Sequence, residues 1–268
     1  MTSLRHFAAL ACALALPAAP ATGQETGQEA EARDERPVRT RVSLGPQLVP
    51  SYPGADKLVV RPFVDVSRAR GDDEFVFEAP DESAGFALLN SGGFSAGPAI
   101  GFEGSRTRKD VGADVRKVGF TVEAGGFVQF QLAPSLRLRA EARRGLGGHD
   151  GWVGNVGADY VARQGDDWLF SIGPRVSLSD GRYQRAYFGV RPEDAARTGL
   201  PVYRPGSGVH AVGATSGLQY QFSRRWGVAG FVRYDRLIDD AGRSPVVRRF
   251  GSRDQFSGGI AATYTFGG

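Results

Sequence analysis

The strongest constraint on the fold is a strict alternation of apolar and polar side chains over long segments of the chain. In the segment 117–132 the polar residues Thr121, Glu123, Gln129 and Gln131 share one face. The opposite face is apolar, with Val118, Phe120, Val122, Ala124, Val128, Phe130 and Leu132. Segments 134–145 and 167–178 repeat this pattern. A period of two residues is typical of β-strands, so the sequence predicts an all-β protein.

The spacing of the alternating segments predicts how the strands are connected. We expect strands near 38–46, 57–69, 73–79, 83–90, 93–103, 117–132, 134–145, 152–163, 167–178, 209–222, 225–237 and 254–266. Tight turns at 133–134, 164–166 and 223–224 alternate with longer links at 104–116, 146–151, 179–208 and 238–253. This pattern predicts a transmembrane antiparallel β-barrel of about twelve strands, with ten to fourteen as alternatives. Short turns and both termini would lie in the periplasm, and the long loops outside the cell.

A soluble β-sandwich also alternates, and two features favour the barrel over it. The longer predicted strands are about twice the length of the roughly 5–6 residues typical of globular proteins. Aromatic side chains lie at strand ends on the apolar face, as the interfacial girdles of a membrane barrel require. These girdle residues are Trp152, Trp168, Phe222, Trp226, Tyr264 and Phe266. We expect the barrel-assembly machinery to recognise the final strand, 254–266, through its terminal aromatic, and this strand to close the barrel.

The first residues predict export from the cytoplasm. Arg5 and His6 precede an apolar run from Phe7 to Leu16, followed by small residues, as in a secretory signal peptide over residues 1–23. A lipoprotein cysteine is the alternative for Cys12, but apolar residues continue well beyond it. The polar segment 24–37 is interpreted as a disordered periplasmic leader, and 38–268 as the barrel. We therefore expect the outer membrane of a Gram-negative bacterium, where lipid and lipopolysaccharide would surround the protein.

Charged side chains on the polar faces are expected to point into the lumen. They are Glu123, Arg137, Arg139, Glu141, Arg143, Arg175, Arg233 and Asp235. Charges of both signs in a narrow barrel usually pair across strands and fill it, which is the interpretation we favour. An arginine-lined pore selective for anions is the alternative. Twelve strands lie between filled eight-stranded barrels and open porins, so size does not decide. The net charge of +4 comes from scattered arginines, so nucleic-acid binding is not expected.

Nothing in the sequence predicts a catalytic or metal site convincingly. The G-x-S-x-G match at 93–97 opens a predicted strand and lacks the helix that a nucleophile elbow needs. His149 lies in a predicted external loop beside Asp150, and Ser105 lies in another, so an enzyme remains an alternative. His210 is expected at the membrane interface, on the face of Val212. We expect a non-enzymatic protein with no cofactor and no metal.

The chain resembles the MipA/OmpV family of outer-membrane proteins. The resemblance is carried by PSYPGAD at 50–56, YFGV at 187–190, GLPVYRPGSGVHAVGA at 199–214, YDRLIDDAGRSPVV at 234–247 and GSRDQFSGGIAATYTF at 251–266. It implies a barrel that acts as a scaffold between a lytic transglycosylase and a murein synthase. Other members of the family are described as porin-like proteins or adhesins.

Three functions follow as expectations. The first is a scaffold or accessory protein for murein-remodelling enzymes. The alternatives are a small-solute porin-like channel and a surface adhesin. The scaffold would have little periplasmic surface, because only the leader and the short turns face that side, whereas a stable interface takes about 800 Å² from each partner.

Overall fold

The computed structural model describes residues 36–267, and its strands form one antiparallel sheet. The expected signal peptide (1–23) lies outside these residues, as does most of the expected leader (24–37). The strands are β1 (Val38–Pro50), β2 (Leu58–Arg70), β3 (Ala84–Gly85), β4 (Leu89–Ser91), β5 (Phe94–Glu103), β6 (Thr121–Ala133), β7 (Leu136–Gly147), β8 (Trp152–Gln164), β9 (Trp168–Ser179), β10 (Gly208–Gln221), β11 (Trp226–Leu237) and β12 (Asp254–Phe266).

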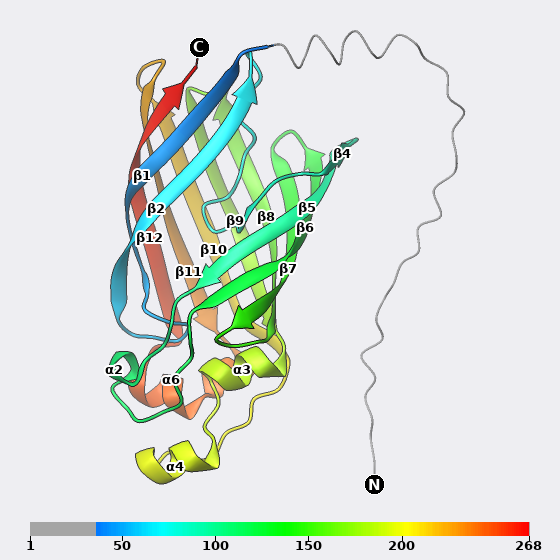
Figure 1. Ribbon diagram of the computed structural model, residues 1–268. Helices are drawn as coiled ribbons and strands as arrows, with labels where there is room; N and C mark the ends of the chain where they lie inside the picture. Colours follow the sequence, from blue (N-terminus) through cyan, green and yellow to red (C-terminus); the bar gives the residue numbers. More distant parts are fainter. Residues whose placement is uncertain (1–35, 268) are drawn as a thin grey trace, which may run out of the picture. The chain divides into compact units, whose positions relative to one another are not determined.

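The strand order is β2-β1-β12-β11-β10-β9-β8-β7-β6-β5, and both β3 and β4 pair with β5 (Figure 1). The final strand, β12, pairs with β11 and with β1, so the first and the last of the described strands lie side by side. The predicted all-β antiparallel barrel is confirmed. Within residues 36–267 the sheet nevertheless stays open between β2 and the stretch formed by β3 and β4.

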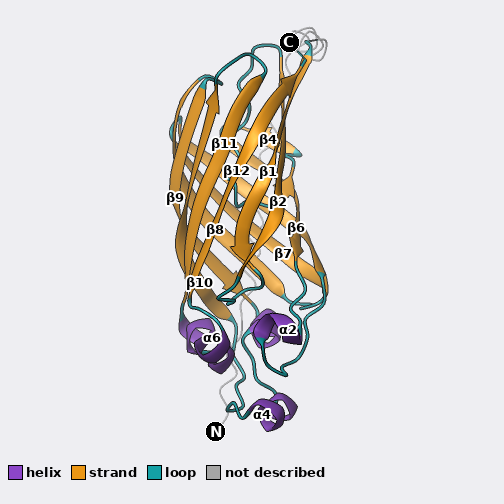
Figure 2. Ribbon diagram, turned by 90° about the vertical axis from the view of Figure 1, so that its left-hand side faces the viewer, coloured by secondary structure: helices purple, strands orange, loops and turns teal. Residues whose placement is uncertain are grey.

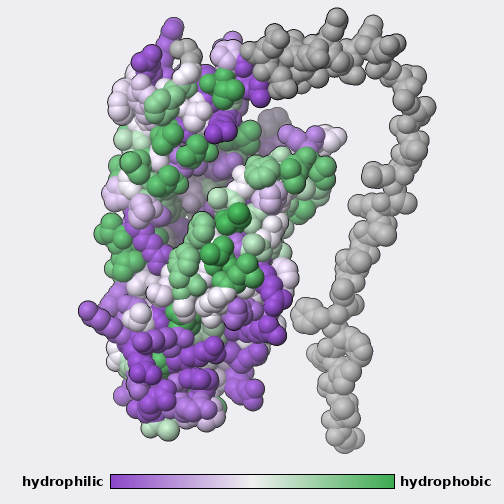
Figure 3. Space-filling model, in the orientation of Figure 1, coloured by the Kyte–Doolittle hydropathy of each residue, from purple (hydrophilic) through white to green (hydrophobic). Residues whose placement is uncertain are grey.

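The apolar side chains of the sheet lie on its outer face, and the charged side chains lie on its inner face, which is the reverse of a soluble protein. On β7 the charged residues at 137, 139, 141 and 143 are buried, whereas the leucines at 136, 138 and 146 are exposed. Hydrophobic residues gather at the middle of the barrel between hydrophilic ends (Figure 3). An apolar outer band between polar ends is what a barrel needs in a bilayer. None of the helices in the described part of the chain is long and apolar enough to cross a membrane.

The long links fold into a cap at the end opposite the C-terminus (Figure 2). They contain the helices α2 (Arg108–Val111), α3 (Gly181–Tyr187), α4 (Pro192–Thr198), α5 (Asp239–Arg243) and α6 (Pro245–Phe250). The main buried apolar cluster lies here and includes Tyr187, Phe188 and Val247. Arg106 is buried beside this cluster and donates to the carbonyl oxygens of Tyr187 (2.6 Å) and Arg116 (2.7 Å). The cap therefore packs around an apolar core at one end of the barrel.

Three predicted strands differ from the structure. The predicted strand 117–132 begins only at Thr121, because Val118 forms an isolated bridge with Arg106 in the cap. The predicted strand 83–90 is reduced to β3 and β4. The predicted strand 73–79 is wrong: these residues form no ladder, and residues 75–79 line the interior cavity instead.

Candidate functional site

The candidate site is the interior of the barrel, which the predicted lumen residues surround. Arg137, Arg139, Glu141 and Arg143 project from β7 and are buried, as are Glu123 on β6 and Arg175 on β9. On β11, Arg233 and Asp235 are partly buried. All eight residues come from alternate positions of their strands, so the pleat alone directs them to one side.

These residues are paired both along β7 and across strands, whereas the sequence led us to expect pairing across strands. The Nε atom of Arg143 lies 3.0 Å from an oxygen of Glu123, and Arg143 also pairs with Glu141. Arg139 is 2.8 Å from Glu141. Asp159 of β8 bridges two arginines, with distances of 2.6 Å to Arg137 and 2.7 Å to Arg175; the sequence reading did not single it out. Its alternation with Val156 and Tyr160 was the available signal.

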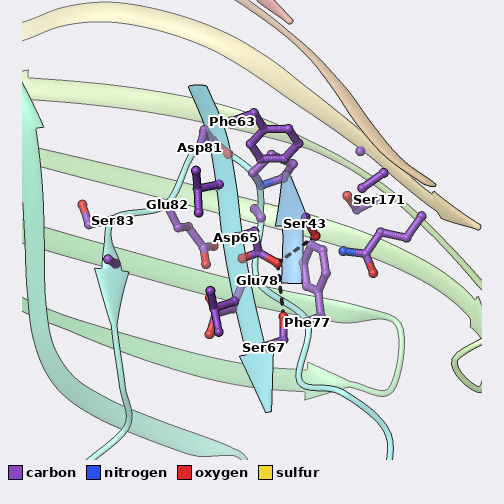
Figure 4. Close-up of a pocket in the computed structure, with 18 of the residues that line it drawn as sticks. Ser43, Phe63, Asp65, Ser67, Phe77, Glu78, Asp81, Glu82, Ser83 and Ser171 are labelled. Atoms are coloured by element: carbon purple, nitrogen blue, oxygen red, sulfur yellow. Dashed lines mark hydrogen bonds between the residues drawn. The ribbon is translucent and has the colours of Figure 1, made fainter. Parts of the chain in front are cut away.

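The other partners come from a segment that enters the barrel after β2, and we call residues 71–83 the inserted segment. Asp81 lies 2.8 Å from Arg175 and 3.1 Å from Arg233. Glu82 pairs with Arg137 and lies 3.6 Å from Arg139. The Ser83 hydroxyl donates to Glu141 (2.9 Å). Asp81, Glu82 and Ser83 follow one another along the inserted segment in Figure 4. Sequence reasoning missed these acids because it assigned the neighbouring residues to the wall.

Aromatic rings of the inserted segment lie under lumen guanidinium groups. The Arg41 guanidinium carbon is 4.0 Å from the centre of the Phe75 ring, and that of Arg137 is 4.3 Å from the Phe77 ring. Arg137 and Arg163 also donate to the carbonyl oxygens of Phe77 (3.1 Å) and Phe75 (2.9 Å). The hydrogen bonds satisfy two carbonyl groups of a backbone that has no ladder partner, and the cation–π contacts hold the two rings in place.

A cavity of about 740 Å³ remains beside the inserted segment. Its lining joins β1, β2, β5 and the inserted segment, and includes Phe63, Asp65 and Glu78 (Figure 4). The Asp65 carboxylate accepts hydrogen bonds from Ser67 (3.2 Å) and Ser43 (3.5 Å), so it is held by hydroxyls and not by an arginine. The lumen is thus partly filled, with a polar space left for a small solute or water.

The histidines lie elsewhere than the sequence predicted. His149 is buried, and its Nε2 atom is 3.1 Å from Glu123, so it pairs with a lumen residue and not with Asp150. His210 was predicted on the outer face of its strand, and this is wrong. It is buried, and its Nδ1 atom lies 3.0 Å from the Ser179 hydroxyl, because a register shift between Val209 and Ala211 turns it inward.

The serine of the G-x-S-x-G match lies in a setting that differs from a nucleophile elbow. Ser95 of the G-x-S-x-G match lies on β5 and contacts Asn90 on β4, with a strand and not a helix after the turn. In residues 36–267, groups of three or more His, Cys, Asp or Glu side chains that could hold a metal ion are absent.

The predicted girdle residues lie at strand ends. Phe222, Trp226 and Phe266 are exposed and Tyr264 is half-buried, and the Trp226, Tyr264 and Phe266 rings form edge-to-face contacts at centroid distances of 4.7 and 4.6 Å. Trp168 is half-buried at the start of β9. Trp152 is exposed at the cap end of β8.

Comparisons with known proteins found one family model and several solved structures. Residues 42–266 match the family model of the MltA-interacting protein MipA. No curated protein sequence matches the chain. Among solved structures, the TodX deltaS2S3 mutant monoaromatic hydrocarbon channel is 8% identical, with a TM-score of 0.34 over 87% of this chain and 90% of that one. The outer-membrane protease OmpT of Escherichia coli is 12% identical, with a TM-score of 0.27 over 86% and 97%. OprB of Pseudomonas putida is 8% identical, with a TM-score of 0.27 over 90% and 96%.

Proposed function

Because the chain belongs to the family of the MltA-interacting protein MipA and forms an outer-membrane barrel, we propose that it is a porin-like channel for small solutes. The observation that carries this proposal is the interior cavity of about 740 Å³. Cavities that hold small molecules usually measure about 300–1,000 Å³. This cavity supports a lumen that its own side chains leave partly open, whereas a filled lumen was the interpretation we favoured from the sequence.

The charges of the lumen suggest weak ion selectivity. Arg137, Arg175 and Arg233 each have a carboxylate partner, so few guanidinium charges are free to attract anions. Uncharged carboxamides and hydroxyls, such as those of Gln47 and Ser67, line the same cavity. Small polar solutes are the class that such a lining accepts, and no chemical step is required of it.

Single-channel recording in planar bilayers tests the channel. We expect small, steady conductance from the refolded barrel, and a shift of the reversal potential toward anions when Asp81→Asn removes one of the two carboxylate partners of each of Arg175 and Arg233. Asp167→Asn, in an exposed turn, is the matched control. A bilayer that stays silent with correctly folded protein would contradict the proposal.

A scaffold for murein-remodelling enzymes is the second candidate, and the family's printed description as an MltA-interacting protein supports it. Its partners would be a lytic transglycosylase and a murein synthase. Crosslinking of intact envelopes followed by purification of the barrel tests it. Recovery of a lytic transglycosylase supports the scaffold, and its absence while the barrel conducts would leave only the channel.

Export and surroundings complete the proposal. Residues 1–23 would be removed as a signal peptide, and the barrel-assembly machinery would recognise β12 through Phe266. The outward side chains would contact lipid and lipopolysaccharide. This proposal assigns no catalytic step and no cofactor to the protein.

A further inference from the structure

The two open edges of the sheet run in the same direction. Every neighbouring pair from β2 through β1 and β12 to β5 is antiparallel, and β3 and β4 are antiparallel to β5. Ten long strands and the β3–β4 stretch therefore leave β2 facing an edge that is parallel to it. One further strand of opposite direction would complete an even-numbered antiparallel barrel.

The open edge of β2 is costly in a membrane. This strand spans 13 residues, and its outer side chains at Val60, Val64 and Val66 are exposed as lipid-facing residues should be. Within residues 36–267, no strand pairs with its second edge. Hydrocarbon offers no partners for the N–H and C=O groups on that edge, which is why membrane barrels close.

A space for the missing strand lies between the two edges. A cavity of about 410 Å³ is bordered on one side by 66–68 of β2 and on the other by 85–87 and Asn90. Residues 76–78 of the inserted segment line the same cavity. The segment that the sequence predicts as a strand, 73–79, therefore lies next to the space where that strand belongs.

The turn that such a strand needs is already formed. The Asp73 N–H donates to the carbonyl oxygen of Arg70 (3.0 Å), and Gly71 between them has a φ of 51°. Continuing the hairpin from this turn would place Phe75 opposite Arg68 and Phe77 opposite Val66. Because side chains alternate, Phe75, Phe77 and Ala79 would then face lipid, while Glu74 and Glu78 would face the lumen.

We propose that residues 73–79 exchange between two positions: inserted in the lumen, or paired as a strand between β2 and the β3–β4 stretch. The second position closes the barrel wall and clears the lumen, so the inserted segment is the gate of the channel. The role of residues 73–79 as a gate rests on the proposed function as a channel. Their exchange between the two positions does not depend on it.

The inserted position is held mainly by charge. Asp81 and Glu82 bind four lumen arginines, and Phe75 and Phe77 lie under Arg41 and Arg137. The paired position would replace these contacts with ladder hydrogen bonds to β2. Removing the two carboxylate charges should therefore shift the exchange toward the paired strand.

The test places a nitroxide label at Phe77→Cys in lipid bilayers, in a chain with Cys12→Ser. Collision with oxygen, which concentrates in lipid, is compared with collision with a water-soluble nickel chelate. With Asp81 and Glu82 intact we expect a label shielded from lipid. With Asp81→Asn and Glu82→Gln we expect oxygen collisions to rise and single-channel conductance to increase about twofold.

The control neutralises two exposed carboxylates outside the inserted segment, Asp167→Asn and Glu193→Gln, and should change neither readout. A label that stays shielded in the Asp81 and Glu82 variant overturns the exchange, even if the barrel conducts. A label that reaches lipid in a barrel that never conducts supports the exchange and overturns the channel. A label exposed to lipid with all carboxylates intact would show that the segment does not rest in the lumen. It would overturn the claim that Asp81 and Glu82 hold the segment there.

Discussion

At the residue scale, the protein depends on arginines buried where a soluble protein would place leucines. Arg137 is 1% exposed and contacts Asp159, Glu82 and the carbonyl oxygen of Phe77. A buried charge of this kind is tolerated only when its partners are in place, since removing one partner leaves the other charge uncompensated. The lumen is therefore sensitive to single carboxylates.

Asp159→Asn should destabilise the barrel strongly. The change removes the carboxylate that two buried guanidinium groups share, at 2.6 and 2.7 Å, so we expect a loss of about 3 kcal/mol in the free energy of unfolding. Urea titration of the barrel in detergent, followed by its electrophoretic shift on unfolding, measures this loss. Asp167→Asn is the control. An equal urea midpoint for both variants would show that the Asp159 carboxylate does not stabilise the barrel.

A carboxylate in the cap makes loop order depend on pH. Asp240 accepts from the Gly206 N–H (2.8 Å) and from Arg243 (2.8 Å), and these contacts hold its pKa below the ordinary value. The stabilisation is fully present above the unfolded pKa of about 3.9 and is lost as the pH falls through the lower folded pKa.

We therefore expect hydrogen exchange at residues 199–207 to be slow and constant from neutral pH down to about pH 4, and to accelerate below it once the intrinsic rate is corrected. Asp240→Asn should exchange quickly at every pH. Exchange that accelerates between pH 7 and 5 in the unchanged protein would contradict this account.

At the element scale, the strands were largely predictable, and the inserted segment was not. Alternation identified β7, β9 and β12 with their faces, because the outer face must be apolar and the inner one polar along the whole strand. Residues 73–79 alternate equally well. Their position depends on Arg137, Arg175 and Arg233, which lie on other strands, and periodicity contains no information about such partners.

A charge on the outer face of a strand should cost far more than one on the cap. Val156 lies within β8 and is 47% exposed. In a soluble protein, a charged substitution at so exposed a position would be tolerated. Val156→Arg should lose about 2–4 kcal/mol of barrel stability, because the guanidinium would face hydrocarbon. Val202→Arg, on an exposed residue of the cap, is the matched control.

Folding into vesicles, monitored by urea titration, separates these two variants. Equal stability for Val156→Arg and Val202→Arg would mean that this face of β8 does not contact lipid.

At the scale of the whole molecule, strand direction and loop length determine part of the architecture, and contacts between distant residues determine the rest. The sequence was sufficient for the pairing of β12 with β1 and for the long loops at one end, since both follow from strand direction and loop length. It was insufficient for the cap, where His149 reaches Glu123 and Arg106 reaches Tyr187 across long separations in the chain. The result is a barrel with a capped end, a cavity of about 740 Å³ and one incomplete stretch of wall.

Swelling of proteoliposomes in sugars of increasing size tests most directly whether this cavity passes solutes. We predict that the protein admits pentoses and excludes trisaccharides. Val76→Trp should slow the uptake, because the 67% exposed Val76 side chain borders the cavity, whereas Val202→Trp on the cap should not. Swelling no faster than that of empty liposomes, or uptake unchanged by Val76→Trp, would contradict a solute path through the lumen.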